Sequence, residues 1–283
     1  MQLLDGKMVA NIVKTGVKDY LFNCKTCPTL AVIQVGNNAA SNTYIKNKVS
    51  ACKYTGINSE VICFDESVSE DELIETIRKL NDNVEINGIL VQLPLPKGFN
   101  EDKILSNISP YKDVDGFHYE NMGKLVAGDK YKQFVPCTPL GIMGLLQYYK
   151  IPIDGKECVV VGRSNIVGKP IALELLHANG TVTIAHSKTQ DLAKVCKRAD
   201  ILVCAIGKAK FFNRDYIKDG AVVIDVGINR DESGNLCGDV DFEDVKDIVS
   251  AISPVPKGVG PMTVAMLMHN CVVAMELQRE RGE

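Results

Sequence analysis

The stretch Glu157-Cys-Val-Val-Val-Gly-Arg-Ser-Asn-Ile-Val-Gly-Lys-Pro170 decides the fold of this chain. Its apolar, β-branched run ends at Gly162, a short polar turn follows, and Gly168 opens a segment whose apolar residues recur at helical spacing. A strand, a tight turn and a helix N-terminus in this order present backbone N–H groups to a phosphate. We therefore expect a nucleotide-binding unit in the middle of the chain, preceded by a region of similar length.

Short apolar runs alternate with helical patterns along almost the whole sequence. This pattern predicts strands at 30–35, 60–64, 88–93, 158–161, 182–186, 201–205 and 222–226. It predicts helices at 6–24, 39–55, 69–81, 138–149, 169–179 and 192–197, and a last one from about 262 to the C-terminus. Strands that alternate with helices form parallel sheets covered on both faces.

The segment Phe-Val-Pro-Cys-Thr-Pro at 134–139 marks a domain boundary. We expect an α/β protein of two α/β domains flanking a cleft, the second a Rossmann-type parallel-sheet nucleotide-binding domain. The first domain comprises residues 1–137 and 263–283, and the second residues 138–262. Residues 109–132 are polar and weakly patterned, which indicates a long loop. Residues 253–261 are too rich in Pro and Gly for regular structure.

Composition excludes several classes of protein. With 46% hydrophobic and 24% charged residues, the 283-residue chain has an ordinary globular composition, and its net charge of −3 favours no nucleic-acid partner. No apolar run is long enough to span a membrane, and the N-terminus lacks the pattern of a signal peptide. We therefore expect a cytoplasmic protein. The ten cysteines are scattered, and those within apolar runs, Cys63, Cys158 and Cys204, are expected to be buried thiols.

The sequence favours NADP over NAD as the cofactor. An NAD site normally carries an acid at the end of its second strand, which binds the ribose hydroxyls. Here that strand ends in His186-Ser187-Lys188-Thr189, and Arg163 lies on the Gly-rich turn. Arg, Ser and Lys would bind a 2′-phosphate that a carboxylate would repel. Because Ser164 replaces the middle glycine of the usual motif, an ordinary strand-to-helix turn is the alternative.

In the first half, Tyr44 and Lys48 lie four apart on one predicted helix and share a face, with Ser41 or Asn42 as the expected cap. A solvated basic face is the simpler interpretation of this spacing. Gln92 stands at the carboxyl end of a predicted strand, where open α/β sheets place their ligands. The loop at 112–118 offers two carboxylates and a histidine, but no further ligand at helical spacing supports a metal site.

Six motifs in order resemble those of the bifunctional methylenetetrahydrofolate dehydrogenase/cyclohydrolase family. They are Tyr44-x-x-x-Lys48, Val91-Gln-Leu-Pro-Leu-Pro96, Lys112-Asp-Val-Asp-Gly-Phe117, Pro136-Cys-Thr-Pro139, Val161-Gly-Arg-Ser-x-Ile-Val-Gly168 and Gly258-Val-Gly-Pro-Met-Thr263. The resemblance spans nearly the whole chain. It implies a homodimer that uses NADP to oxidise 5,10-methylenetetrahydrofolate to the methenyl cation and then hydrolyses this cation to 10-formyltetrahydrofolate.

The resemblance also implies roles for individual residues. Lys48 is the key catalytic group with Gln92 as its neighbour, Tyr44 stacks on the folate, and Asp115 holds the pterin. The folate is further contacted by Leu93, Gly260, Pro261 and Thr263. The cofactor is contacted by Gly162, Arg163, Ser164, Ile166, Gly168, Ser187 and Ile228, with Arg163 and Ser187 on the 2′-phosphate; no residue is assigned to a metal.

These residue types suit the chemistry. Oxidation transfers a hydride and removes no proton, so geometry dominates that step. Hydrolysis needs an activated water beside a cationic carbon, and a neutral Lys48 could serve as base if its neighbour carries no charge; Gln92 meets this condition. A monofunctional member of the family, or a nucleotide-binding protein without catalysis, is the alternative.

One residue departs from the family pattern. Lys257 stands where glycine is frequent in the family, and lysine does not adopt positive φ cheaply. Either this position has ordinary φ or the loop differs slightly. A lysine here could attract the polyglutamate tail of folate, but an exposed loop lysine is the simpler interpretation.

Overall fold

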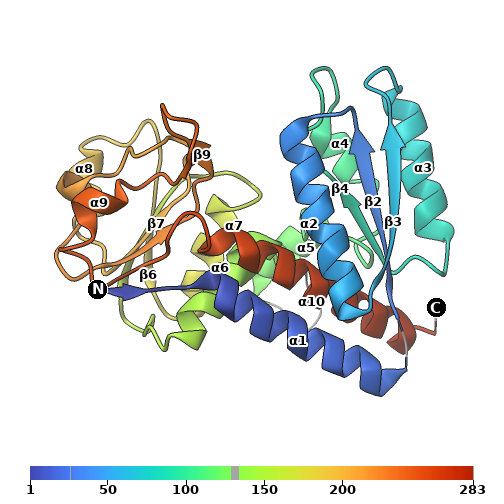
Figure 1. The fold of residues 1–283 in the computed structure, drawn as a ribbon, viewed down its shortest axis with the longest axis horizontal. Helices are drawn as coiled ribbons and strands as arrows, with labels where there is room; N and C mark the ends of the chain where they lie inside the picture. Colours follow the sequence, from blue (N-terminus) through green and yellow to red (C-terminus); the bar gives the residue numbers. More distant parts are fainter. Residues whose placement is uncertain (26, 129–133, 283) are drawn as a thin grey trace. The chain divides into compact units, whose positions relative to one another are not determined.

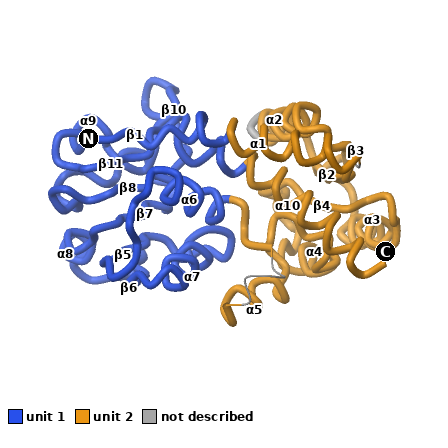
Figure 2. Tube along the Cα trace, turned by 90° about the horizontal axis from the view of Figure 1, so that it is seen from below, with its two compact units in different colours: residues 1–10, 138–263 blue, residues 11–137, 264–283 orange. Residues whose placement is uncertain are grey.

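The structure is a computed structural model that describes residues 1–25, 27–128 and 134–282 (Figure 1). Contacts divide the chain into two compact units, shown in Figure 2: unit 1 comprises residues 1–10 and 138–263, and unit 2 residues 11–137 and 264–283. The division differs from the expected boundary for the first ten residues. They join unit 1 because β1 (Gln2–Leu3) pairs in parallel with β11 (Ala251–Ile252), two short strands that the sequence pattern did not reveal.

Unit 1 is built on a six-stranded sheet with the order β1-β11-β8-β7-β5-β6, in which all neighbours are parallel. Its long strands are β5 (Glu157–Val161), β6 (Thr181–Ala185), β7 (Ile201–Cys204) and β8 (Val222–Asp225). The strand order reverses at β5, which pairs with β6 on one side and β7 on the other. A doubly wound sheet binds its ligand at the carboxyl ends of the strands at such a switch point.

The remaining elements of unit 1 connect these strands. They are α6 (Cys137–Tyr148), α7 (Gly168–His177), α8 (Leu192–Cys196), the 3₁₀ turn η1 (Arg214–Tyr216), the hairpin of β9 (Asn229–Arg230) with β10 (Leu236–Cys237), and α9 (Phe242–Val245). Two further helices, α1 (Gly6–Cys24) and α10 (Val259–Glu280), contribute residues to both units. The core is apolar, with Val159, Leu202 and Val223 fully buried on the sheet.

Unit 2 contains a three-stranded parallel sheet with the order β3-β2-β4. Its strands are β2 (Thr29–Val35), β3 (Asn58–Phe64) and β4 (Gly88–Val91), and its other helices are α2 (Ala39–Thr55), α3 (Glu70–Asp82), α4 (Glu101–Leu105) and α5 (Tyr119–Ala127). Ile33 and Val91 pack with Leu73 and Ile77 of α3 and Ile104 of α4 in one buried cluster. In Figure 1, α2 lies on the other side of the strands from α3.

Four details correct the expectations. The expected loop at 109–132 contains α5, which ends at Gly128 with φ +82, the left-handed cap that glycine favours; residues 129–132 lie outside the described part. The last helix begins at Val259 because Pro261 falls in its first turn, where a missing N–H costs nothing. Cys63 is exposed because it lies on β3, an edge strand. The cap of α2 is Asn38, whose Oδ1 accepts the N–H of Ser41 at 3.3 Å.

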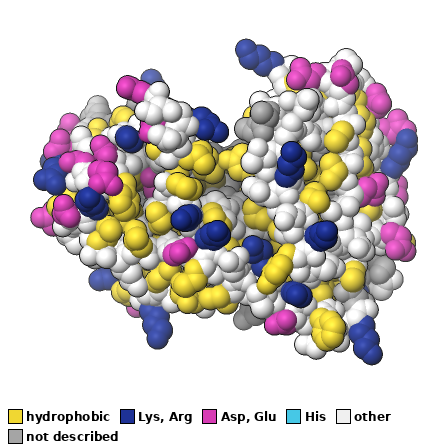
Figure 3. Space-filling view, viewed as in Figure 1, with side chains coloured by type: hydrophobic (Ala, Val, Ile, Leu, Met, Phe, Trp, Pro, Cys, Tyr) yellow, Lys and Arg dark blue, Asp and Glu magenta, His cyan; other side chains and the backbone are white. Residues whose placement is uncertain are grey.

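On the face drawn in Figure 3, Lys and Arg side chains are interspersed with Asp and Glu. This mixture agrees with the small net charge of the chain. Within the described residues, no helix has the length and apolar character that crossing a membrane requires.

Candidate functional site

The first group of predicted site residues lies in unit 2, around Lys48 on α2. The Lys48 Nζ donates a hydrogen bond of 3.0 Å to Oε1 of Gln92, which directly follows β4. The amide of Gln92 is 9% exposed and is fixed at its other end, since its Nε2 donates to the carbonyl of Leu93 at 2.6 Å. The carbonyl oxygen of the amide is therefore held toward the lysine. Tyr44, one turn earlier on α2, is 37% exposed, and burial raises the pKa of its hydroxyl.

Asp115 is delivered by a loop that two other buried charges hold in place. The ammonium of Lys112 donates to the carbonyls of Leu80, Asn81 and Asn83 at the end of α3, at 3.1, 2.7 and 2.8 Å. The carboxylate of Asp113 accepts from the N–H groups of Phe117 and His118 and from the amide of Asn121. Lys112 and Asp113 thus hold the loop in place through these hydrogen bonds. Asp115 is the remaining acid of this loop and is available to a ligand.

Asp115 is half-buried, and burial raises the pKa of its carboxyl while the positive charge of Lys48 and a contact with Cys137 lower it. In the described part of the chain, no ion pair within 4.0 Å joins Lys48 to Asp115. The lysine thus has a neutral hydrogen-bond partner, with a carboxyl group in electrostatic range but not in contact. Such an arrangement leaves the amine available to a water or a ligand.

Sequence reasoning assigned no role to two residues that support Asp115. The buried thiol of Cys137 lies 3.3 Å from the carbonyl of Val114 and 3.7 Å from Oδ1 of Asp115, and burial raises the pKa of this thiol well above its ordinary value. Asn270 on α10 is 3% exposed and donates to the carbonyls of Val114 and Val135 at 2.8 and 3.2 Å. The signal for Asn270 was present in the sequence, as a polar residue inside an apolar helical run.

The second group lies in unit 1, on the turn between β5 and α7. Gly162 has φ +133, and a Cβ there would collide with the carbonyl of Ala205. A Cβ on Gly168 would collide with the carbonyl of Gly162, so both glycines are required by close backbone contacts. The hydroxyl of Ser164 accepts from the N–H groups of Val167 and Gly168 at 3.2 and 3.3 Å. Ser164 thus caps the start of α7 from within the turn, and the turn ends at a helix N-terminus, a place that favours anions.

The predicted 2′-phosphate residues flank this turn. Arg163 and Ile166 lie on it and are exposed. Ser187 follows β6, the strand that pairs with β5, and is also exposed. The turn after β6 is closed by His186, whose N–H donates to Oγ1 of Thr189 at 2.9 Å. Because β5 and β6 are parallel neighbours, the residues that follow them lie at the same edge of the sheet.

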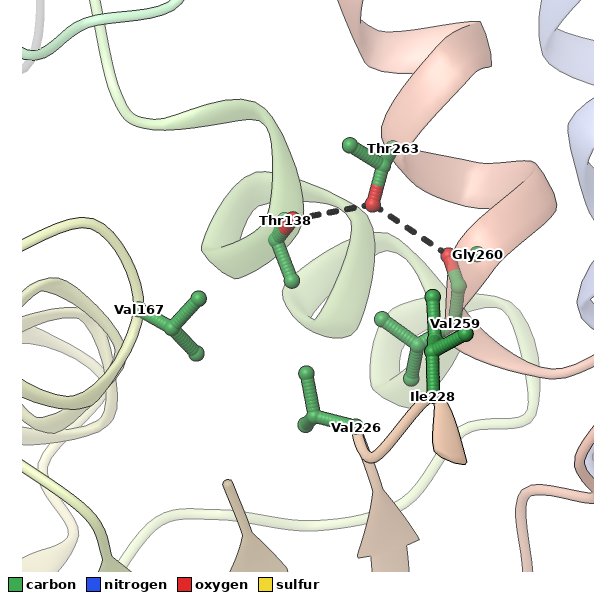
Figure 4. Close-up of a pocket in the computed structure, with 7 residues that line it drawn as sticks. All are labelled: Thr138, Val167, Val226, Ile228, Val259, Gly260 and Thr263. Carbon is green, nitrogen blue, oxygen red and sulfur yellow. Dashed lines mark hydrogen bonds between the residues drawn. The ribbon is translucent and has the colours of Figure 1, made fainter. Parts of the chain in front are cut away.

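A pocket of about 240 Å³ lies at this edge of unit 1. It brings together three predicted residues, Ile228, Gly260 and Thr263, with four that were not predicted: Thr138, Val167, Val226 and Val259. Figure 4 shows the side chains of Val167, Val226 and Ile228 pointing into a common space. The hydroxyls of Thr138 and Thr263 are hydrogen-bonded at 2.9 Å. The lining is mainly aliphatic, which suits a flat ring more than a charged group. Pro261 does not line this pocket.

The two parts of the chain match two domains of one known protein family. A sequence model described as the catalytic domain of tetrahydrofolate dehydrogenase/cyclohydrolase matches residues 4–115, and one described as its NAD(P)-binding domain matches residues 136–279. The chain belongs to the tetrahydrofolate dehydrogenase/cyclohydrolase family. The bifunctional protein FolD of Lachnoclostridium phytofermentans is 55% identical over 273 residues, which cover 95% of this chain and 96% of that protein.

Solved structures of the tetrahydrofolate dehydrogenase/cyclohydrolase family agree in fold. The bifunctional FolD enzyme of Campylobacter jejuni superposes with a TM-score of 0.95 at 47% identity, covering 98% of this chain and 99% of that one. The FolD of Trypanosoma brucei, solved with NADP cofactor and an inhibitor, superposes with a TM-score of 0.92 at 34% identity, covering 98% and 97%. Among the described residues of this chain, no group of three or more His, Cys, Asp or Glu could hold a metal ion.

Proposed function

We propose that this protein oxidises 5,10-methylenetetrahydrofolate to 5,10-methenyltetrahydrofolate with NADP and then hydrolyses the product to 10-formyltetrahydrofolate. The observation that carries the proposal is the hydrogen bond of 3.0 Å between Lys48 and Gln92. An amide partner binds the lysine without adding a negative charge. The membership of the chain in a dehydrogenase/cyclohydrolase family supports both reactions.

For the oxidation, bound NADP would supply the hydride acceptor. Its phosphates would bind at the turn around Gly162, because the chain passes there from the carboxyl end of β5 to the N-terminus of α7, where helices bind anions. Arg163 and Ser187 would hold the 2′-phosphate, and the aliphatic pocket beside Ile228 would take an uncharged ring face. The enzyme's contribution to this step is orientation, because no proton has to move.

For the hydrolysis, Lys48 would take a proton from the attacking water. The amine must be neutral when it acts, and a cationic product favours that state by repelling an ammonium group. Gln92 would hold the amine in position through its carbonyl oxygen and would stabilise the charged form less than a carboxylate would. Asp115 would bind the donor edge of the pterin, and Tyr44 would stack on the folate ring. Leu93 would add an apolar contact, since it is half-buried beside Gln92.

The test is to mix the protein with methylenetetrahydrofolate and NADP and to follow the absorbance of the methenyl product. Its formation reports the oxidation and its decay the hydrolysis. We expect Lys48→Gln to abolish the decay while the protein remains folded. Lys46→Gln is the matched control, because Lys46 lies on the same helix and is exposed. Hydrolysis at the wild-type rate by Lys48→Gln would exclude Lys48 as the base.

We also propose that the protein is a cytoplasmic homodimer. Strand β3 is an edge of its sheet and carries the exposed Val61, with the exposed aromatic residues Tyr20, Phe22 and Tyr54 elsewhere in unit 2. Apolar residues and an open sheet edge favour association with a second copy. All ten cysteines are free thiols, which suits a reducing compartment. Light scattering of the purified protein tests the dimer, and a monomeric mass at micromolar concentration would exclude it.

A further inference from the structure

Two buried carboxylates at the carboxyl end of the unit 1 sheet have no role in the proposed chemistry. Asp225 is the last residue of β8 and is 4% exposed, and Asp239 follows β10 and is 0% exposed. Within the described part of the chain, neither carboxylate forms an ion pair within 4.0 Å. Buried charges without a counter-ion need hydrogen-bond donors, and both acids are surrounded by them.

Asp239 binds two separate loops. Its Oδ2 accepts from the N–H groups of Ile206 and Gly207 at 2.6 and 3.0 Å, and its Oδ1 accepts from the N–H of Lys208 at 2.8 Å. Oδ1 also accepts from the side-chain amide of Asn229 at 2.9 Å. Three successive N–H groups that converge on one anion form a nest. The loop after β7 is thus wrapped around this single carboxylate, which also holds the first residue of β9.

Asp225 in turn fixes the backbone on which Asp239 stands. Its carboxylate accepts from the N–H groups of Asp239 and Val240 at 2.9 and 3.0 Å, and from that of Gly227 at 2.9 Å. The packing leaves no space for side chains at two glycines that contact these carboxylates. A Cβ on Gly238 would collide with the carboxylate of Asp225, and one on Gly227 with that of Asp239.

Both loops border the nucleotide site described above. The loop after β7 begins at Ala205, whose carbonyl lies where a side chain on Gly162 would have to be. The loop after β8 supplies Val226 and Ile228 to the pocket wall (Figure 4). Asp225 fixes this second loop at Gly227, between the two pocket residues, and Asp239 fixes it at Asn229. The walls of the site on this side therefore depend on one pair of acids.

We propose that Asp239 is a positioning residue for the nucleotide cofactor, whose carboxylate holds the loops after β7 and β8 in the geometry that binds it. This inference rests on the proposed function, because it takes the pocket and the Gly162 turn as the NADP site. Without the carboxylate, three N–H groups lose their acceptor and both loops can shift. Leaving buried donors without an acceptor is enough to raise the Kd about tenfold, which corresponds to about 1.4 kcal/mol of binding free energy.

The test compares Asp239→Asn with the matched control Asp200→Ala. Asp200 lies at the opposite end of the same sheet, where its carboxylate accepts from the N–H of Glu157 at 3.0 Å and from Lys218 at 2.7 Å. We expect Asp239→Asn to raise the Kd for NADP, measured by calorimetry without folate, and the KM for NADP by about tenfold. The KM for methylenetetrahydrofolate should change less than twofold, and Asp200→Ala should leave the Kd for NADP unchanged.

Three results would overturn the inference: an unchanged Kd for NADP in folded Asp239→Asn, an equal rise of Kd in Asp200→Ala, or parallel losses of oxidation and hydrolysis. If Asp239→Asn does not fold, Asn229→Ala decides, because it removes only the contact to the second loop. That variant should still weaken NADP binding severalfold, and unaltered binding would count against the inference. A wild-type protein that binds NADP but oxidises no folate would refute the proposed function alone.

Discussion

Replacing Lys257 by glycine should stabilise the protein. Lys257 has φ +85, which lies in the left-handed region, and its side chain is exposed. Its backbone cannot simply relax, because its carbonyl accepts the N–H of Lys7 in the first turn of α1 at 3.0 Å. Lys257 therefore holds a backbone conformation that suits glycine, although lysine has a Cβ. Of the two alternatives left open by the sequence, ordinary φ is excluded.

The size of the effect follows from two opposing contributions. Holding a residue with a Cβ in the left-handed region costs about 1–2 kcal/mol. Glycine relieves this strain but makes the unfolded chain more flexible, which costs about 0.4–1 kcal/mol. The two contributions leave a net gain of at most about 1.6 kcal/mol, with a midpoint of about 0.8 kcal/mol, in the free energy of unfolding. For a chain of this size such a gain corresponds to a rise in Tm of roughly 1–4 °C.

Calorimetry of Lys257→Gly, Lys257→Ala and the wild type separates the backbone from the side chain. Alanine removes the same charge and the same flexible chain but keeps the Cβ, so Lys257→Ala should unfold within about 0.5 kcal/mol of the wild type. Only glycine should raise the Tm. If both variants shift the Tm equally, the side chain and not the backbone is responsible. A lower Tm for Lys257→Gly would refute the reasoning altogether.

Four further outcomes are expected. Asp115→Ala should raise the KM for folate in both oxidation and hydrolysis, and an effect on one reaction alone would indicate a different role. Arg163→Ala should raise the KM for NADP about tenfold or more with little change in the KM for NAD, since a charge-assisted hydrogen bond contributes about 1.5–3 kcal/mol. An unaltered preference for NADP would exclude Arg163 as a contact of the 2′-phosphate. Lys112→Met should lower the free energy of unfolding in urea by about 3 kcal/mol or more, because three hydrogen bonds of a buried ammonium are lost, one of them buried and two partly buried. Lys103→Met is the control, because it breaks an exposed ion pair and should lower the free energy of unfolding by less than about 1 kcal/mol. Equal losses of stability in Lys112→Met and Lys103→Met would contradict the structural role of Lys112. Burial raises the pKa of Asp225 from 3.8 to about 7, so the native state binds the proton of this carboxyl more tightly than the unfolded state does. The protonated carboxyl therefore contributes to stability in full below pH 4, and this contribution is lost as the pH rises toward 7. The stability of the wild type relative to Asp225→Asn should therefore fall between pH 5 and 7 by about 1.4 kcal/mol per pH unit, and a difference independent of pH would refute the shift.

Periodicity predicted the long elements because they bury one face each. The bounds expected for α1 and α2 are those observed, and each of the seven predicted strands is present within two residues. The short strands β1 and β11 escaped because two residues are too few to show a period of two. Helix α5 escaped because its ends depend on caps, His118 and Gly128, more than on an apolar stripe.

The residues that the sequence missed share a physical feature: their partners are backbone groups. Asn270, Lys112 and Asp239 each bind carbonyl or N–H groups of segments far away in the sequence. A backbone group leaves no signature in the amino-acid sequence, so nothing at residues 206–208 announces an acid at 239. Such residues stand out in a sequence only as polar side chains where burial is expected. Their partners become visible once the fold is known.

The family resemblance implied that Gln92 is the neighbour of Lys48, and the topology gives a physical reason for the pairing. Strands β2 and β4 are parallel neighbours, so Gln92 after β4 and the start of α2 after β2 lie at the same edge of the sheet. Lys48 is near the middle of α2, so a helix that runs back along the sheet still keeps it within reach of that edge. The long side chain of Lys48 brings its Nζ within 3.0 Å of Oε1 of Gln92. Topology thus places Gln92 at this edge, and the role as base that we propose for Lys48 favours an amide over a carboxylate there.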